Sequence, residues 1–208
     1  MKRESQGGGE MEQESPGKGA LEAVSASAQE EKGGNVQKKL KIPWEKILQG
    51  IVVILALLLT ANLVFWRYYW IPSASMEPTL KIEDRIIVNK VSYWITKPHR
   101  GEIIVFKYPL NVKKHYIKRI IGLPQEKVEI KKSMVYIDDQ PLREAYLQEI
   151  KYNNYGPVVV PEGHYFVLGD NRVNSMDSRI WGFVENSYII GKVFYRYWPF
   201  ERMANLNN

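Results

Sequence analysis

Two serines stand between prolines in residues 71–80. A serine hydroxyl becomes a nucleophile when a base removes its proton and hydrogen-bond donors bind the oxyanion that develops. In an extended segment Ser73 and Ser75 project in the same direction, and Pro72 and Pro78 stiffen its ends. Ser75 is therefore a candidate nucleophile, with its own N–H and the Ser73 hydroxyl as candidate donors. A polar turn with no catalytic role explains the same composition.

A lysine in an apolar segment is the candidate base. Strand alternation in residues 116–124 places Tyr116, Lys118 and Ile120 on one face and Arg119 on the other. Burial disfavours the charged form of lysine, so its pKa can fall from about 10.4 toward neutrality, at a cost of about 4 kcal/mol for about three units. Arg119 cannot be the base because a guanidinium does not lose its proton in proteins. An ordinary strand with a solvated Lys-Arg pair is the alternative.

A third segment, residues 169–179, is too polar to form a core. It is either a solvated loop or a hydrogen-bonded network that positions other groups. In the second case Asp177 and Arg179 can form an ion pair, and Ser175 can hydrogen-bond a lysine amine.

A Ser-His-Asp triad is a weaker hypothesis. His115 lies an odd number of residues from Lys118, so one strand would not present both to the same site, and His164 is surrounded only by a turn. The chain has 3 His and no Cys, and no two histidines have the spacing of metal ligands. We therefore expect no metal site and no cofactor.

The chain of 208 residues carries a net charge of +6, and 45% of its residues are hydrophobic, as expected for one modest folded domain with an anchor or tail. The first 66 residues hold as many basic as acidic groups, so the excess lies entirely beyond them. A surplus of this kind favours nucleic acid or anionic lipid headgroups. Because an anchor lies nearby, we expect lipid and not nucleic acid to be the partner.

An apolar run at residues 47–66 predicts a transmembrane helix, since about 20 apolar residues are needed to cross hydrocarbon. With its flanking aromatic residues we assign residues 44–68 to this helix. A buried core helix and a cleaved signal sequence fit less well, because the run is long and follows a long polar stretch. Residues 1–43 are predicted to be a disordered tail. Four lysines, at positions 38, 39, 41 and 46, indicate that this tail is cytoplasmic and the following domain extracytoplasmic.

The remaining residues, 69–208, show short β-branched and aromatic segments separated by Pro, Gly, Asn and Asp. The predicted strands are residues 85–91, 102–108, 115–121, 127–130, 134–137, 163–168 and 189–197, with a longer crossing segment at 144–160. We expect a mainly β fold. It consists of an antiparallel, barrel-like catalytic domain behind a single N-terminal transmembrane helix and a disordered cytoplasmic tail.

The three polar segments, in this order behind one anchor, resemble the bacterial type I signal peptidases, a family of Ser/Lys serine endopeptidases. The resemblance covers residues 71–200. It rests on SASMEPTL at 73–80, YIKR at 116–119 and GDNRVNSMDSR at 169–179. Lysine and not histidine at position 118 is typical of the bacterial and organellar branch. The chain departs from the family at Gln125, Glu126 and Glu83, which all lie in predicted turns.

The resemblance implies a role for each matching residue. Ser75 would attack the scissile carbonyl, Lys118 would be the general base, and Ser73 with the Ser75 amide would hold the oxyanion. Ser175 would orient the lysine. Asp177 and Arg179 would form a supporting ion pair, and Asp170 would belong to the same structural motif.

Substrate residues before the cut would bind as an extended strand, with small side chains at the positions one and three before it. The pockets for them would be lined by Ile71, Met76, Leu80, Tyr116 and Ile117.

The implied function is removal of N-terminal signal peptides from exported precursor proteins after small-x-small sites. The expected partners are these signal peptides and the lipid bilayer, with the secretion translocon as a further candidate. The expected location is the plasma membrane, crossed once. A self-cleaving repressor with a Ser/Lys centre is one alternative, but residues 1–43 are neither helical in period nor strongly basic. A catalytically inactive membrane-anchored homologue that binds exported peptides is another.

Overall fold

The computed structural model describes residues 43–147 and 152–206. The predicted tail therefore lies outside the described residues, except for Pro43. The apolar run forms one helix, α2 (Trp44–Phe65), with a mean hydropathy of 2.5 and no buried residue. At about 1.5 Å per residue a helix of 22 residues is long enough to cross a bilayer. It is the one such helix in the described part of the chain.

The helix ends three residues before the boundary that the sequence predicts. The aromatic residues that follow it form strand β1 (Trp66–Trp70), which pairs with β2 (Arg85–Asn89) so that Trp66 lies opposite Asn89. Aromatic side chains favour strands as well as membrane interfaces, and composition alone does not separate these two environments. Pairing with β2 is what makes this segment a strand.

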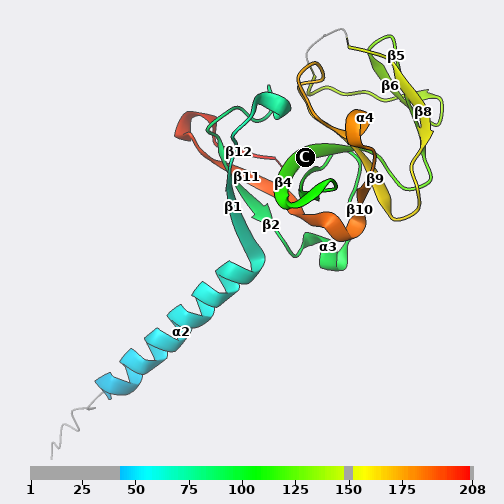
Figure 1. Cartoon of the computed structure of the whole chain (residues 1–208). Helices are drawn as coiled ribbons and strands as arrows, with labels where there is room; N and C mark the ends of the chain where they lie inside the picture. Colours follow the sequence, from blue (N-terminus) through cyan, green and yellow to red (C-terminus); the bar gives the residue numbers. More distant parts are fainter. Residues whose placement is uncertain (1–42, 148–151, 207–208) are drawn as a thin grey trace, which may run out of the picture. The chain divides into compact units, whose positions relative to one another are not determined.

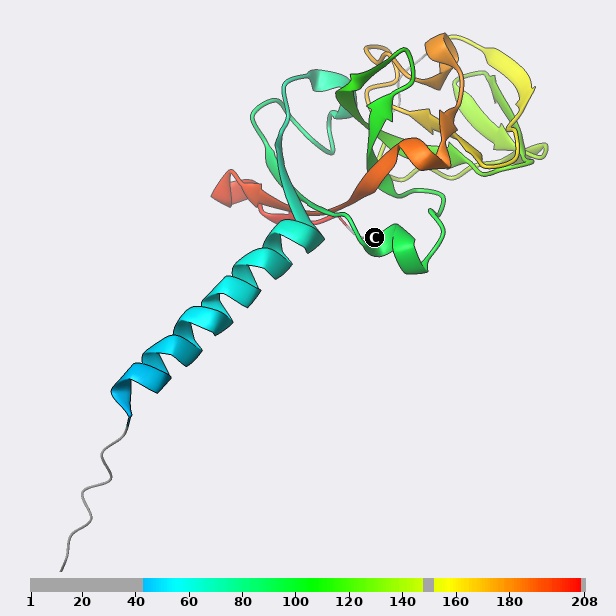
Figure 2. The same cartoon turned by 60° about the horizontal axis from the view of Figure 1, so that its bottom comes forward.

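The domain beyond the helix is built from two antiparallel sheets (Figures 1 and 2). The larger sheet has the strand order β1-β2-β11-β3-β4-β9-β10, with β12 paired to β11. Its remaining strands are β3 (Ile103–Tyr108), β4 (Asn111–Gly122), β9 (His164–Leu168), β10 (Val184–Glu185), β11 (Ile189–Trp198) and β12 (Ala204–Asn205).

The smaller sheet has the order β7-β6-β5-β8. Its strands are β5 (Lys127–Lys131), β6 (Met134–Ile137), β7 (Gln140–Pro141) and β8 (Tyr155–Val159). All seven predicted strands are present. Strand β8 falls inside the predicted crossing segment, which also contains the undescribed residues 148–151. The short helical turns are η1 (Ala74–Met76), α3 (Ser92–Ile95), α4 (Ser178–Trp181), η2 (Asn186–Tyr188) and η3 (Phe200–Arg202).

The prediction of a mainly antiparallel β domain is confirmed, and the domain is barrel-like only in a loose sense. Within the described residues the two ends of the larger sheet, β1 and β10, do not pair with each other. Strand β4 is central to the arrangement, because it pairs with β3 along most of its length and with β9 only from Arg119 onward. Within the described residues, 115–118 therefore pair along one edge only.

Two hydrophobic clusters hold the segments that carry the candidate residues. One contains Met76 and Leu80, buried against side chains of β2, β3 and β11, with Ile117 of β4 packed on it. The other contains Ile120 of β4 with Ile104 and Phe106 of β3. Strand β4 thus contributes to the core from both faces, and its central residues are fixed in position.

Candidate active site

The candidate nucleophile lies in a tight turn and not in a strand. Ser73 is extended, but Ala74–Met76 forms the 3₁₀ turn η1, closed by the Glu77 N–H donating to Ala74 O at 3.1 Å. Met76 is 1% exposed and anchors this turn in the core. The segment is therefore not extended throughout, yet the Ser73 and Ser75 Oγ atoms lie 3.4 Å apart.

The candidate base is in contact with the candidate nucleophile. Lys118 Nζ lies 2.8 Å from Ser75 Oγ and 2.9 Å from Ile117 O, although 43 residues separate Lys118 from Ser75. A charged amine donates to both oxygens. A neutral amine can instead accept the Ser75 proton, which is the geometry that general-base catalysis requires.

Burial of Lys118 favours its neutral form, which can act as a base. Lys118 is only 4% exposed. Loss of hydration lowers the pKa of Lys118 to about 8, and the carboxylates of Asp177 and Asp170 oppose the fall. At pH 7 roughly a tenth of the molecules then carry a neutral amine, compared with about one in several thousand for a solvated lysine.

The polar segment at residues 169–179 contains a buried network of charged side chains, although Val173, Asn174 and Met176 are exposed. Asp170, Arg172 and Asp177 are each no more than 2% exposed. The segment also holds the turn that carries the nucleophile, because Asn171 donates from its N–H to Ser75 O and from Nδ2 to Ala74 O, each at 3.1 Å.

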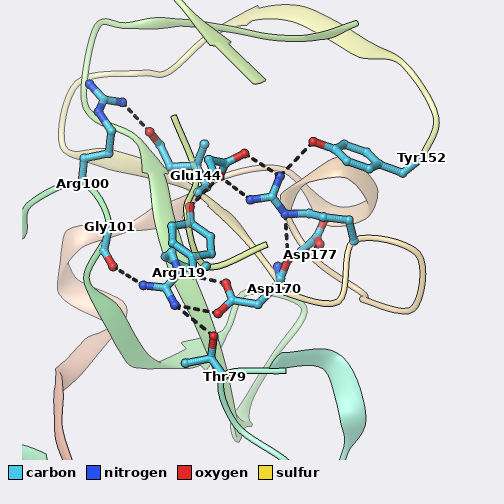
Figure 3. Close-up of polar contacts among 12 residues, drawn as sticks. Thr79, Arg100, Gly101, Arg119, Glu144, Tyr152, Asp170 and Asp177 are labelled. Atoms are coloured by element: carbon cyan, nitrogen blue, oxygen red, sulfur yellow. Dashed lines mark hydrogen bonds and ion pairs between the residues drawn. The ribbon is translucent and has the colours of Figure 1, made fainter. Parts of the chain in front are cut away.

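Three ion pairs organise this network, and Figure 3 shows the pair of Arg119 with Asp170. Arg119 binds Asp170 through Nε at 2.9 Å and Nη2 at 2.6 Å, and also donates to Gly101 O at 2.7 Å. Arg179 binds Asp177 through Nε and Nη2, both at 2.8 Å. The ion pair that the sequence predicts between Asp177 and Arg179 is present, and Asp170 pairs with the residue that follows the candidate base.

The third ion pair was not predicted. Arg172 is paired with Glu144 through both carboxylate oxygens, and its Nε donates to Gly169 O at 3.0 Å. The opposite side of Gly169 is held by Asp177, whose Oδ2 accepts from the Gly169 N–H at 3.1 Å. Glu144 lies in a segment with no periodic signal, so the sequence offers no clue to this contact.

Ser175 does not hydrogen-bond the lysine in the described residues. Its Oγ is buried and has no hydrogen-bond partner. The chain between Val173 and Met176 alternates in direction: Asn174 and Met176 line the cavity beside the lysine, while Val173 and Ser175 line a different cavity. The orienting role expected for Ser175 has no direct contact to support it.

A cavity of about 430 Å³ surrounds the Ser75 and Lys118 side chains. Of the predicted residues it is lined by Ile71, Ser73, Ser75, Met76, Tyr116, Ile117 and Lys118. Leu80 does not line it, because this side chain is 0% exposed and packs in the core. The lining residues that the sequence did not suggest are Tyr69, Trp70, Pro72, Ala74, His115, Asn174 and Met176.

His115 lines the same cavity as Lys118, so the alternation argument against this was wrong. The cavity lies at the unpaired edge of β4, and side chains of both faces reach an edge. His115 Nδ1 lies 3.2 Å from Tyr69 Oη, and not beside Ser75. His164 Nδ1 lies 2.9 Å from Glu162 O and does not line the cavity. No Ser-His-Asp arrangement is present in the described residues.

Two segments of the chain line the cavity on opposite sides and run in the same direction along it. One wall is residues 69–76, and the other is residues 115–118. The walls meet at the Tyr69–His115 contact toward their N-terminal ends and at the Ser75–Lys118 contact toward their C-terminal ends. The free edge of β4 can pair with an added strand, so the cavity suits an extended peptide.

Comparison with known proteins gives consistent findings. A sequence model of the family described as signal peptidase, peptidase S26, matches residues 44–198. A probable signal peptidase I-2 of Synechocystis sp. is 45% identical over 161 residues, which are 75% of this chain and 73% of the relative. A signal peptidase I of Leptolyngbya laminosa is 44% identical over 165 residues, which are 76% and 80% of the two chains.

A solved structure, a signal peptidase I from Enterococcus faecalis, aligns with a TM-score of 0.41 and 40% identity. The alignment covers 47% of this chain and 97% of the solved one.

Burial of Lys118 has a cost that can be measured. The folded-state pKa of about 8 lies below the ordinary value of 10.5, so below pH 8 the fold carries a buried charge, while above pH 10.5 the amine is neutral in both states. Lys118→Met should therefore raise the free energy of unfolding by about 3 kcal/mol at neutral pH, and this gain should vanish by about pH 10.5. Urea unfolding followed by tryptophan fluorescence in detergent measures both.

Lys114→Met is the matched control on the same strand, since Lys114 is exposed and its replacement should change stability by less than about 0.5 kcal/mol. Equal effects of the two substitutions at every pH would contradict a strained, buried Lys118.

Loss of the Glu144 charge should destabilise the fold. The Glu144 and Arg172 side chains are only 6% and 2% exposed, so Glu144→Gln leaves a buried cation without its counter-ion. We expect a loss of about 3 kcal/mol in the free energy of unfolding. Glu129→Gln is the control, because its Lys131 partner is 43% exposed and the pair should contribute less than about 1 kcal/mol. If Glu144→Gln loses no more stability than the Glu129→Gln control, the Arg172 network does not stabilise the fold.

Proposed function

The chain belongs to the signal peptidase family, peptidase S26, and from this premise we propose that it cuts with Ser75 as nucleophile and Lys118 as general base. It is a type I signal peptidase, a serine endopeptidase that acts on the signal peptides of secreted precursors. The observation that carries the assignment of the two residues is the 2.8 Å contact between Ser75 Oγ and a lysine whose pKa is about 8.

Acylation begins with proton transfer. The neutral Lys118 amine takes the Ser75 proton, and Oγ attacks the carbonyl carbon of the scissile bond. The carbonyl oxygen becomes an oxyanion, for which the Ser73 hydroxyl and the Ser75 N–H are the proposed donors. The position of the Ser73 Oγ, 3.4 Å from the attacking oxygen, supports this role.

Collapse of the tetrahedral intermediate breaks the peptide bond. The Lys118 ammonium gives its proton to the leaving amine of the mature protein, and the signal peptide stays esterified to Ser75. The neutral lysine then takes a proton from water, the resulting hydroxide attacks the ester carbonyl, and Ser75 is released with a proton returned from Lys118. No step needs a metal or an organic cofactor.

The cleft beside the catalytic pair supports recognition of an extended signal-peptide end. An added strand can hydrogen-bond the free edge of residues 115–118, which makes binding largely independent of sequence. Ile71, Met76, Tyr116 and Ile117 crowd the cleft, and we propose that this crowding restricts the positions one and three before the cut to small side chains.

The apolar helix α2 anchors the enzyme in a membrane. We propose that the membrane is the plasma membrane, with the N-terminus in the cytoplasm and the catalytic domain outside. The four lysines before the helix support this orientation. Contact of the domain with the bilayer and with the secretion translocon belongs to the same proposal. The alternative of an inactive peptide-binding homologue has no support from the site, where nucleophile and base are in contact.

The assignment predicts which variants cut. Wild-type enzyme in detergent should cleave a purified precursor with a small-x-small site, whereas Ser75→Ala and Lys118→Ala should lose at least about a thousandfold in kcat. Because the base must be neutral, kcat should rise through about pH 8 and level off above it. Lys114→Ala and Ser187→Ala, both exposed, are the controls.

Full activity of Lys118→Ala would show that another group is the base. An inert wild-type enzyme, tested in lipid as well as in detergent, would favour the peptide-binding alternative.

The turn that carries Ser75 should tolerate no side chain at position 169. A Cβ on Gly169 would lie 2.2 Å from Ser175 Oγ and 2.4 Å from Ser75 O. Gly169→Ala must therefore shift either its own loop or the Ser75 turn, and we expect a loss of about a hundredfold in kcat with little change in KM. Gly50→Ala in α2, where a Cβ meets nothing within 4 Å, is the control. A kcat near that of wild type would mean that the position of Ser75 O does not matter.

A further inference from the structure

A second cavity of about 390 Å³ lies behind the wall formed by residues 173–176. Asn174 and Met176 face the catalytic cavity, whereas Val173 and Ser175 face the second one. The two cavities therefore share one short stretch of chain as a partition. The second cavity is completed by Asn153 before β8 and by Arg179 and Ile180 of α4.

Ser175, which lines the second cavity, lies close to the backbone of Ser75. A Cβ atom placed on Gly169 would lie 2.2 Å from Ser175 Oγ and 2.4 Å from the carbonyl oxygen of Ser75, so these two atoms are close to each other. The buried Ser175 Oγ has no hydrogen-bond partner in the protein. Ser175 therefore links the second cavity to the backbone of the Ser75 turn.

The direction of the substrate follows from the anchor and the cleft. A signal peptide that ends at the membrane surface enters the cleft from the side of Tyr69, which follows α2 by only four residues. It then passes the Ser75–Lys118 pair at the other end of the cleft. The loop with Asn174 and Met176 lies at this end, because Asn171 of the same loop donates to Ala74 O and Ser75 O. The residues after the scissile bond then lie near residues 173–176, which border the second cavity.

We propose that the second cavity binds the first residues of the mature protein, the segment immediately after the scissile bond. The inference rests on the proposed function. Two exposed apolar side chains, Val173 at 64% and Ile180 at 65%, offer contact surface to an extended peptide. Asn153 offers hydrogen-bonding groups to its backbone.

The charges around this subsite are balanced. Arg172 is neutralised by Glu144 and Arg179 by Asp177, and both contacts are ion pairs through two or more hydrogen bonds. The subsite should therefore accept neutral mature segments without strong preference for either sign of charge. A charge introduced on its rim should create a preference that the wild-type enzyme lacks.

The test introduces opposite charges at Ile180. Purified full-length enzyme in detergent is given precursors with a single Lys or Asp at each of about the first six mature positions, which span about 20 Å when extended. Ile180→Glu should raise the ratio of kcat/KM for Lys over Asp precursors by about two- to fivefold at a few adjacent positions, and Ile180→Lys should lower it by a similar factor. The ratio is taken within each variant, so a lower folded fraction does not affect it.

Val159→Glu is the matched control, because Val159 is 61% exposed on β8 and lines neither cavity. It should leave the ratio at the wild-type value. If the ratios of both Ile180 variants equal that of wild type at every position while precursors are still cut, the subsite is disproved and the proposed function stands. If the wild-type enzyme cuts no precursor, the proposed function fails and the subsite with it.

Discussion

Burial of one lysine without a counter-ion is the constraint on which the rest of the structure depends. A solvated Lys118 would be almost fully protonated near neutral pH and could not take a proton from Ser75. The next residue, Arg119, is also buried, but its charge is neutralised by an ion pair with Asp170. Alternation along β4 sends these adjacent cations into different surroundings. One becomes a weak acid near pH 8, and the other remains a permanent charge that holds the loop beside it.

The polar loop at residues 169–179 supplies the rigidity that this arrangement needs. Gly169 is held at its N–H by Asp177 and at its carbonyl by Arg172, and its lack of a side chain lets Ser75 O approach. Each of these side chains is itself neutralised by a partner. The loop therefore buries several charges with few unpaired groups, a requirement for any polar network in a low-dielectric interior. Its carboxylates also lie near enough to Lys118 to moderate the fall in its pKa.

Much of this fold follows from local sequence signals, and the failures have identifiable causes. Alternation and turn residues predict the seven principal strands, and a long apolar run predicts α2. Three features depend on tertiary contacts that no local pattern encodes. Residues 66–70 form β1 because β2 pairs with them, and Glu144 is buried because it pairs with Arg172. The third is the burial of Leu80 in the core. Alternation of side chains along a strand does not predict the site either. Ser75 lies in a 3₁₀ turn, and the cavity at the free edge of β4 is lined by side chains from both faces of the strand.

The proposed catalytic pair lies between two proposed binding regions. Before it, the cleft offers the free edge of a strand, and such an edge binds any extended backbone and discriminates only by the space left for side chains. After it, the partition at residues 173–176 separates the pair from a second cavity with balanced charge. A protease that must cut many different precursors needs weak preferences on both sides of the bond. In the proposed function, selection then rests on small side chains at the cut itself, where Ile71, Met76, Tyr116 and Ile117 line the cleft.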